Sequence, residues 1–236
     1  MKEWIEGLLP LERDLFLSLN GSESLFLDNV MWTISGRLVW IPLYLFILFL
    51  FFYRVPRKEG ILAALFLILV FVLCDQVSSA IFKPRFERFR PTHHPDFKDI
   101  VDTVNDYRGG LYGFISGHAT NSFGLAVFLS LLFRHRAVTL ITLFWAALNS
   151  YTRIYLGVHF VSDILAGMLA GSLLALLVYL VYSWTRKRVV HSKGFYSSRG
   201  RSHSPYRKHG ALFAGCIAIY LAAVILFSSL LATLPH

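Results

Sequence analysis

Three short stretches of the sequence combine histidine, cationic and carboxylate side chains at spacings that could support chemistry. They are KPRFERFRP at 83–91, ISGH at 115–118 and TRIYLGVHFVSD at 152–163. The candidate residues within them are Lys83, Arg90, Ser116, Gly117, His118, Arg153, His159 and Asp163. Each stretch borders a long apolar segment, in a chain that is 56% hydrophobic and only 16% charged. Polar groups in such places need an explanation.

The third stretch is the most informative of the three. His159 and Asp163 are four residues apart, so they share one face of a helix that begins by His159. A carboxylate beside an imidazole accepts its N–H, fixes its tautomer and stabilises the cation that forms when the other nitrogen reacts. A simpler interpretation is an ion pair at a helix start, where Asp163 favours the helix dipole. That interpretation does not explain why a second histidine and several cations accompany the pair.

The other two stretches also have simple interpretations when each is taken alone. Lys83 and Arg90 could form a basic collar that reaches from a helix end to the membrane surface. Ser116 could cap a helix, with Gly117 easing the turn and His118 incidental. Together, however, cations and a helix N-terminus bind anions, and two histidines can attack phosphorus and protonate the leaving oxygen. The combination indicates phosphoryl transfer, with cations and amides stabilising the transition state.

These motifs resemble the signature of the type-2 phosphatidic acid phosphatase family, which shares its site with the vanadium haloperoxidases. The three parts of that signature, Lys-x6-Arg-Pro, Pro-Ser-Gly-His and Ser-Arg-x5-His-x3-Asp, match the three stretches in order. The resemblance covers about residues 61–184, and the three motifs are specific when they occur together. Two positions depart from it: Ile115 replaces the motif proline and Thr152 replaces the serine. Neither change removes a reacting atom, so we expect activity.

The resemblance implies a role for each candidate residue. His159 is then the nucleophile and forms a phosphohistidine, Asp163 orients it, and His118 is the general acid. The phosphate-binding residues are Lys83, Arg90, Ser116, Gly117 and Arg153. No metal and no other cofactor is implied. The HHPD run at 93–96 could suggest a metal site, but no further ligand spacing supports one.

Transmembrane helices are the elements that must position these residues, because a helix of ~20 mostly apolar residues crosses a bilayer. We expect an all-α, polytopic membrane protein, a bundle of about six helices that forms one integral-membrane phosphatase domain over 1–236. The spans are predicted at about 33–53, 61–82, 117–133, 137–155, 160–184 and 211–233. The first 20 residues favour equally an amphipathic helix on the membrane surface and an ordinary solvated lead-in. Cys74 and Cys216 lie in apolar runs and are expected to be free thiols.

The distribution of basic residues predicts the orientation of the chain. More than half of the 23 lysines and arginines fall in the turns 54–60 and 134–136 and in the basic loop 185–210. The positive-inside tendency places these segments in the cytoplasm. The active site then faces the periplasm or exterior, from the inner (cytoplasmic) membrane of a bacterium. The net charge of +9 is thus a topology signal, and nucleic-acid binding by SSRGRSHSPYRKHG is the weaker interpretation.

The expected partners are the lipid bilayer and a membrane lipid phosphate, whose head group enters the site while its tail stays in lipid. Undecaprenyl diphosphate and lipid A phosphates rank close together, and the sequence does not separate them. Phosphatidylglycerophosphate and phosphatidic acid are the alternatives. An anion-binding transporter is the alternative of another class. Transporters usually place polar groups near the bilayer centre, whereas here Asp75 alone does so.

Overall fold

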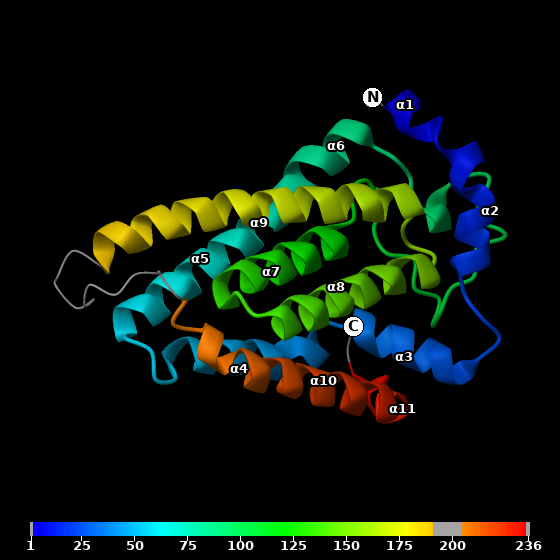
Figure 1. The fold of residues 1–236 in the computed structure, drawn as a ribbon. Coiled ribbons are helices and arrows are strands. Elements are labelled where there is room, and N and C mark those ends of the chain that lie inside the picture. Colours follow the sequence, from blue (N-terminus) through cyan, green and yellow to red (C-terminus); the bar gives the residue numbers. More distant parts are fainter. Residues whose placement is uncertain (1, 191–203, 235–236) are drawn as a thin grey trace.

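The structure, a computed structural model, describes residues 2–190 and 204–234. The described chain is built from helices and contains no strand, apart from an isolated bridge between Phe89 and Tyr112 (Figure 1). The α-helices are α1 Lys2–Glu6, α2 Leu9–Leu19, α3 Leu25–Ser35, α4 Ile41–Phe52, α5 Arg57–Gln76, α6 Lys83–Phe86, α7 Gly117–Phe133, α8 Arg136–Tyr155, α9 Val161–Val189, α10 Gly210–Leu226 and α11 Ser228–Leu231. The 3-10 turns are Leu38–Trp40, Pro91–His93 and Arg207–His209, and a π-helical turn, Val77–Phe82, joins α5 to α6. The expected all-α class is confirmed.

Each of the six predicted spans corresponds to helical structure, and the multi-pass membrane architecture is confirmed. Among the described residues, three helices are long and apolar enough to cross a membrane: Arg57–Phe86, Val161–Val189 and Arg207–Leu226. The first predicted span differs from expectation, because it begins at Leu25 and is a pair of helices bent by 68°. The bend falls where Gly36 ends α3 in an extended conformation. Taken as one span, this pair is a fourth candidate, and α7 is a shorter apolar helix of 17 residues.

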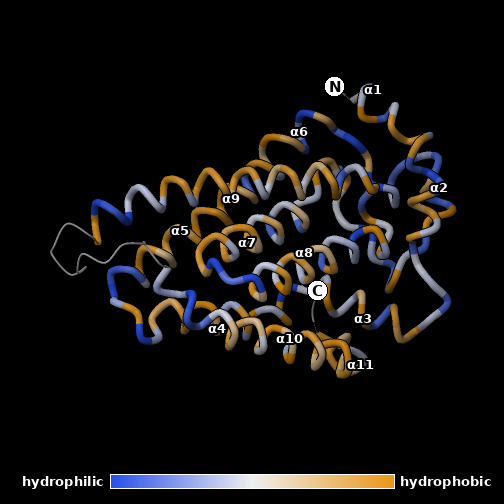
Figure 2. The backbone as a smooth tube through the Cα atoms, in the orientation of Figure 1, coloured by the Kyte–Doolittle hydropathy of each residue, from blue (hydrophilic) through white to orange (hydrophobic). Residues whose placement is uncertain are grey.

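Helix α7 occupies the middle of the bundle and packs against α5, α8 and α9 (Figure 1). Small residues allow α7 and α9 to approach closely. A side-chain carbon at Gly171 of α9 would lie 2.1 Å from the carbonyl oxygen of Thr120 of α7. Hydrophobic residues lie along much of α4, α5, α9 and α10 (Figure 2), and large apolar side chains of these helices are exposed, as a lipid-facing surface requires.

The N-terminal helices α1 and α2 lie at one end of the bundle and cover it (Figure 1). Ile5 of α1 is buried in a cluster with Phe114 and Ile115. Phe16 of α2 packs edge-on or tilted against two other aromatic rings, those of Phe97 and Phe160. This segment is therefore helical, but one of its faces is buried on the protein, which neither sequence interpretation had included.

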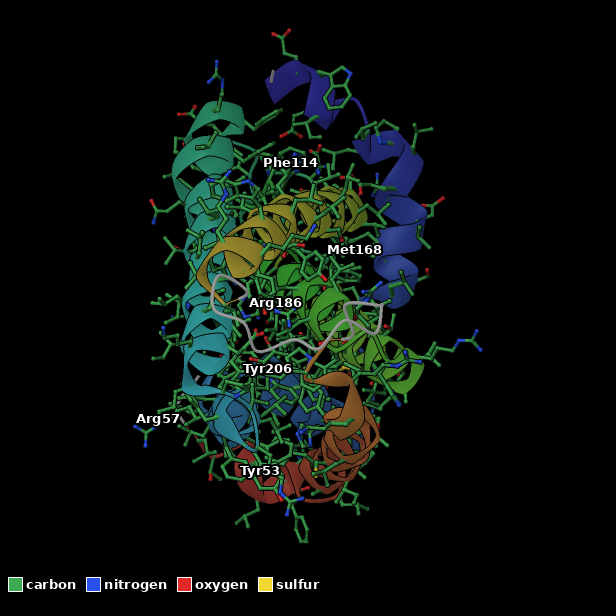
Figure 3. All side chains as sticks on the ribbon, turned by 60° about the vertical axis from the view of Figure 1, so that its left-hand side comes forward. Tyr53, Arg57, Phe114, Met168, Arg186 and Tyr206 are labelled. Atoms are coloured by element: carbon green, nitrogen blue, oxygen red, sulfur yellow. The ribbon has the colours of Figure 1, made fainter. Side chains whose placement is uncertain are left out.

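The opposite end of the bundle carries the basic segments. Arg186 of α9 pairs with the buried Glu59 of α5 at 2.8 Å, and the hydroxyl of Tyr206 donates to the Glu59 carbonyl at 3.1 Å. Figure 3 brings this end forward and shows Arg186 close to Tyr206, with Phe114 toward the N-terminal helices. The centre of the predicted basic loop 185–210 lies outside the described residues, which end at 190 and resume at 204.

Candidate active site

A cavity of about 600 Å³ is bordered by the break between α3 and α4, by the α5–α6 helix, and by α7 and α8. The structure brings six of the eight predicted site residues to its wall. They are Lys83, Arg90, Gly117, His118, Arg153 and His159. The other two, Ser116 and Asp163, lie immediately behind the wall and are both fully buried. Residues from three separate sequence stretches thus converge on one cavity.

His159 lies in the tight turn between α8 and α9. The turn contains Gly157 with a φ of +70°, a conformation that glycine adopts without strain. The imidazole is 1% exposed, and its Nδ1 lies 3.2 Å from Oδ2 of Asp163 in the first turn of α9. The same oxygen accepts from the backbone N–H of Phe160 at 3.1 Å. The predicted pair is therefore present, and Nδ1–H donation to the carboxylate leaves the lone pair of Nε2 available for attack.

Two buried arginines reach the cavity without a carboxylate partner. Arg90 donates to two backbone carbonyls at 3.2 and 3.4 Å. Arg153 donates to the hydroxyls of Ser35 and Tyr107, and its Nε has no hydrogen-bond partner among the described residues. Within that same part of the chain, no carboxylate oxygen lies within 4.0 Å of the side-chain nitrogens of these arginines or of Lys83. Cations left uncompensated in a buried wall fit a multiply charged anion.

The same cations change the acid–base properties of the site. Burial, followed by the charges of Arg90, Arg153 and Lys83, holds the pKa of His159 well below its ordinary value of 6.5. The imidazole is therefore neutral, and able to act as a nucleophile, at neutral pH. Burial and the nearby Arg153 lower the pKa of Arg90 to about 10. Burial acts to raise the pKa of the Tyr107 phenol, but the charge of Arg153 and its hydrogen bond outweigh that effect and lower it.

The second motif is placed by the start of α7. Ser116 is the N-cap, and its Oγ accepts from the Ala119 N–H at 3.4 Å. Its side chain thus performs the capping role that the simpler interpretation gave it. Gly117 and His118, the first two helical residues, face the cavity. Their backbone N–H groups are among those that an α-helix leaves without internal partners, which suits an anion at this end.

The two departures from the family motifs are accommodated away from the reacting groups. Ile115 is fully buried and packs beside Phe114 and Ile5. The hydroxyl of Thr152 donates to the carbonyl of Asn149 within its own helix, at 2.7 Å. Neither residue is part of the cavity wall.

Several polar side chains at or behind the cavity wall were not among the predicted site residues. Arg88, Glu12 and the half-buried Ser162 form a polar group behind Asp163. Further polar residues of the cavity wall are Ser35, Arg37, Asp75, Ser79, Tyr107, Asn121 and Asn149. Arg88 lies inside the first motif, two residues before Arg90, and that was a usable signal. Glu12 had none, because it is one of three consecutive charged residues of α2 and nothing local distinguishes it from Arg13 and Asp14.

The HHPD run does not form part of this site. His94 Nε2 lies 3.3 Å from Oε2 of Glu6 in α1, and His93 contacts the hydroxyl of Thr92. In the described ranges, no three His, Cys, Asp or Glu side chains are grouped as metal ligands. The two cysteines are free, as expected, with Cys74 buried and Cys216 half-buried.

Comparison with known proteins gives a consistent result. Residues 61–187 match the model of the PAP2 superfamily. Lipid A 4′-phosphatase from Porphyromonas gingivalis is 46% identical over 184 residues, which are 78% of each chain. The Lipid A 4′-phosphatase of Bacteroides thetaiotaomicron is 37% identical over 178 residues, which are 75% of this chain and 79% of that one. The crystal structure of a transmembrane PAP2-type phosphatidylglycerolphosphate phosphatase from Bacillus subtilis has the same fold, with a TM-score of 0.58 and 24% identity over 80% of this chain and 90% of that one.

Proposed function

This chain belongs to the PAP2 superfamily and is a membrane lipid phosphatase, and from that premise we propose that it removes the 4′-phosphate of lipid A through a phosphohistidine on His159. The observation that carries the proposal is the double character of the cavity. Its wall carries two histidines with cations that have no carboxylate partner, and it also carries apolar side chains, among them Leu38, Ile41 and Phe71. Such a space accepts a phosphate and a hydrocarbon chain from the same molecule.

The apolar side chains of the cavity wall come from membrane-spanning helices and from the bend between α3 and α4. Ile41 of α4, Phe71 of α5 and Leu38 at the bend belong to the wall and are also exposed. A side opening between these helices would let acyl chains remain in the bilayer while the head group reaches the histidines. A transporter, the alternative considered from the sequence, would not require the paired nucleophile.

The proposed reaction proceeds in two balanced steps. In the first, Nε2 of His159 attacks phosphorus, the bond from phosphorus to the sugar oxygen breaks, and His118 gives its proton to that oxygen. In the second, His118 takes a proton from water, whose oxygen attacks the phosphohistidine and releases inorganic phosphate and free His159. Asp163 stabilises the imidazolium formed during attack. Lys83, Arg90, Arg153 and the N-terminus of α7 stabilise the charge on the non-bridging oxygens.

The identity of the sugar phosphate rests on the two Lipid A 4′-phosphatases, which match more than three quarters of their own length. The cavity wall agrees with this choice, because Asp75, Ser79 and Asn121 offer hydrogen-bonding groups suited to the hydroxyls of a phosphorylated sugar. Phosphatidylglycerophosphate is a second candidate. Phosphatidylglycerophosphatase B of Bacillus subtilis is 34% identical over 138 residues, which are 55% of this chain and 60% of that one.

The substrate and the nucleophile are tested together on the purified protein. Phosphate release is measured with lipid A, undecaprenyl diphosphate and phosphatidylglycerophosphate, and the lipid A product is analysed for the position that was cleaved. We expect lipid A to be preferred, cleavage at the 4′ position, and activity that survives chelators. His159→Ala should lose at least ~1,000-fold in kcat, since it removes the group that forms the covalent intermediate. Retained turnover in folded His159→Ala would exclude the proposed nucleophile.

The location that we propose is the inner membrane of a bacterium, with the cavity open toward the periplasm. The basic residues support this orientation, since Arg57, Arg134 and Arg186 all belong to the end of the bundle remote from the cavity. Lipid A phosphates are then met at the outer leaflet of that membrane.

A further inference from the structure

A buried arginine, Arg88, lies directly behind the carboxylate of Asp163. Its side chain is 0% exposed, and its Nη1 donates to Oδ1 of Asp163 at 2.7 Å and to Oγ of Ser162 at 2.6 Å. The two oxygens of Asp163 therefore have different partners. Oδ1 accepts from Arg88, and Oδ2 accepts from the imidazole of His159 and from the backbone N–H of Phe160.

The second partner of Arg88 comes from the N-terminal helix α2. Its Nη2 donates to Oε1 of Glu12 at 2.6 Å. Oε2 of the same carboxylate accepts from the backbone N–H of Ser162 at 2.8 Å, and the Ser162 hydroxyl donates to Oε1 at 2.8 Å. Ser162 lies in the first turn of α9, where backbone N–H groups have no partner inside the helix and a negative charge is stabilising. Glu12 thus holds Arg88 and also binds the end of the helix that carries Asp163.

An aromatic layer limits where the guanidinium of Arg88 can go. The group lies over the ring of Phe160, 4.5 Å from its centre. The Phe160 ring in turn packs against Phe97 and Phe16, with centroids 5.0 and 5.3 Å away. The ring of Phe160 thus covers one face of the guanidinium, and the two carboxylates that accept from its nitrogens set its orientation over that ring.

The charges of this group are interdependent because all of them are buried. Burial acts to lower the pKa of Arg88, but Asp163 and Glu12 outweigh that effect and raise it, so the arginine stays charged. Without the charge of Glu12, Asp163 would be the only carboxylate left to Arg88. The guanidinium could then turn to bind both oxygens of Asp163, as paired arginines and carboxylates often do. That rotation would compete with His159 for Oδ2.

We propose that Glu12 is a positioning residue for the catalytic histidine, and that it acts through Arg88 to keep Oδ2 of Asp163 facing His159. Helix α2 then contributes to the geometry of the active site through Glu12. Glu12 is not part of the cavity wall, so it reaches His159 only through Asp163, which it holds by way of Arg88 and of Ser162 in the first turn of α9. The inference rests on the proposed role of His159 as the nucleophile.

The first test compares two N-terminal carboxylates. Glu12→Gln keeps the size of the side chain and removes its charge. Glu6→Gln is the matched control, because Glu6 also tethers the N-terminal segment, through His94, but makes no contact with Asp163. We expect Glu12→Gln to lose about 10- to 100-fold in kcat, as small displacements of a reacting group do, with KM changed by no more than about twofold. Glu6→Gln should keep the kinetics of the natural protein.

A second set of readouts separates positioning from a purely structural role. Arg88→Lys keeps the charge but loses the two-pronged geometry, and it should reproduce the kcat loss. The double variant Glu12→Gln/Arg88→Lys should lose little more than the worse single variant, since the two residues act in series. The acid limb of the kcat–pH profile should move in Glu12→Gln and stay in place in Glu6→Gln. If Glu12→Gln does not yield folded protein, Glu12→Asp, which retracts the charge by one methylene, carries the same test.

The outcomes distinguish this inference from the proposed function. Retained turnover in His159→Ala overturns the proposed function. If His159→Ala is inactive while folded Glu12→Gln matches Glu6→Gln in kcat and pH profile, the positioning inference alone is overturned. A lower melting temperature in Glu12→Gln with unchanged kcat per folded molecule has the same meaning, because it shows that Glu12 only anchors α2.

Discussion

At the scale of single residues, two arginines of one short stretch, Arg88 and Arg90, have different kinds of partner. Arg88 donates to two carboxylates and a hydroxyl, so its charge is balanced inside the protein. Arg90, two residues later, donates only to backbone carbonyls and has no carboxylate partner, as its proposed role in phosphate binding requires. Residue type is the same in both cases, and the neighbouring carboxylates make the difference. Charge alone therefore does not identify a phosphate-binding arginine.

A glycine beside the catalytic pair gives a residue-scale prediction. A side-chain carbon at Gly113 would lie 2.9 Å from Oδ2 of Asp163 and 3.5 Å from Nδ1 of His159. The carboxylate must then shift, so we expect Gly113→Ala to lower kcat by about 10- to 100-fold while the protein remains folded. Steady-state phosphate release and thermal unfolding in detergent measure the two effects. Gly215→Ala in α10, where a new methyl group meets open space, is the control, and equal kcat in the two variants would contradict the prediction.

At the scale of elements, the close contact between α7 and α9 brings two motifs together. His118 lies in the first turn of α7 and Asp163 in the first turn of α9, so the separation of these helices sets the distance between the proposed general acid and the proposed nucleophile pair. Glycines on α9 permit that separation. A side-chain carbon at Gly167 would lie 2.8 Å from the carbonyl oxygen of Ser116, and Gly171 is tighter still.

Enlarging this contact is expected to cost both stability and activity. Gly171→Leu would force α7 and α9 apart, because the obstructing atom is backbone and cannot rotate away. We expect a loss of about 1–3 kcal/mol in the free energy of unfolding, typical of an overpacked core, together with a lower kcat. Gly215→Leu adds the same side chain in an open position of α10 and should change neither. The prediction fails if the two leucine variants have the same melting temperature in detergent and the same kcat.

At the scale of the whole molecule, the two ends of the bundle differ in chemistry. The cavity and the covering helices α1 and α2 occupy one end, and Arg186 and the flanks of the basic loop occupy the other (Figures 1 and 3). Hydrophobic residues lie along much of the helices between the two ends (Figure 2). A lipid phosphatase needs this arrangement, since its polar reaction must occur at the surface while the substrate tail stays in the bilayer.

The proposed orientation leads to a labelling prediction. Asp99 lies on the cavity side and Lys187 at the basic end, and both are exposed. In intact cells, a maleimide that does not cross the inner membrane should label Asp99→Cys and leave Lys187→Cys unlabelled until the cells are lysed. The natural protein is the blank for Cys74 and Cys216, which are buried and half-buried. The reverse labelling pattern would place the active site in the cytoplasm.

The sequence by itself determined the family, the helical class and the pairing of His159 with Asp163. Each of these depends on local information, namely apolar segments of membrane length or residues four apart on one helix. The three motifs likewise identified the cationic side chains near the cavity and the capping role of Ser116. These features could be predicted from the sequence because each is a property of a single helix or turn.

Only the tertiary structure decided what each polar group contacts. Glu12 is 76 residues from Arg88 and 150 from Ser162, and no periodicity links such positions. The bend between α3 and α4, which brings Ser35 to Arg153, also depends on neighbouring helices. Hydrogen bonds and buried ion pairs form between atoms that are close in space. The residues that carry these atoms can be far apart in the sequence, so local sequence patterns do not predict the contacts. The sequence therefore indicated the groups that we propose to react, and the packing of the helices determined which residues contact them.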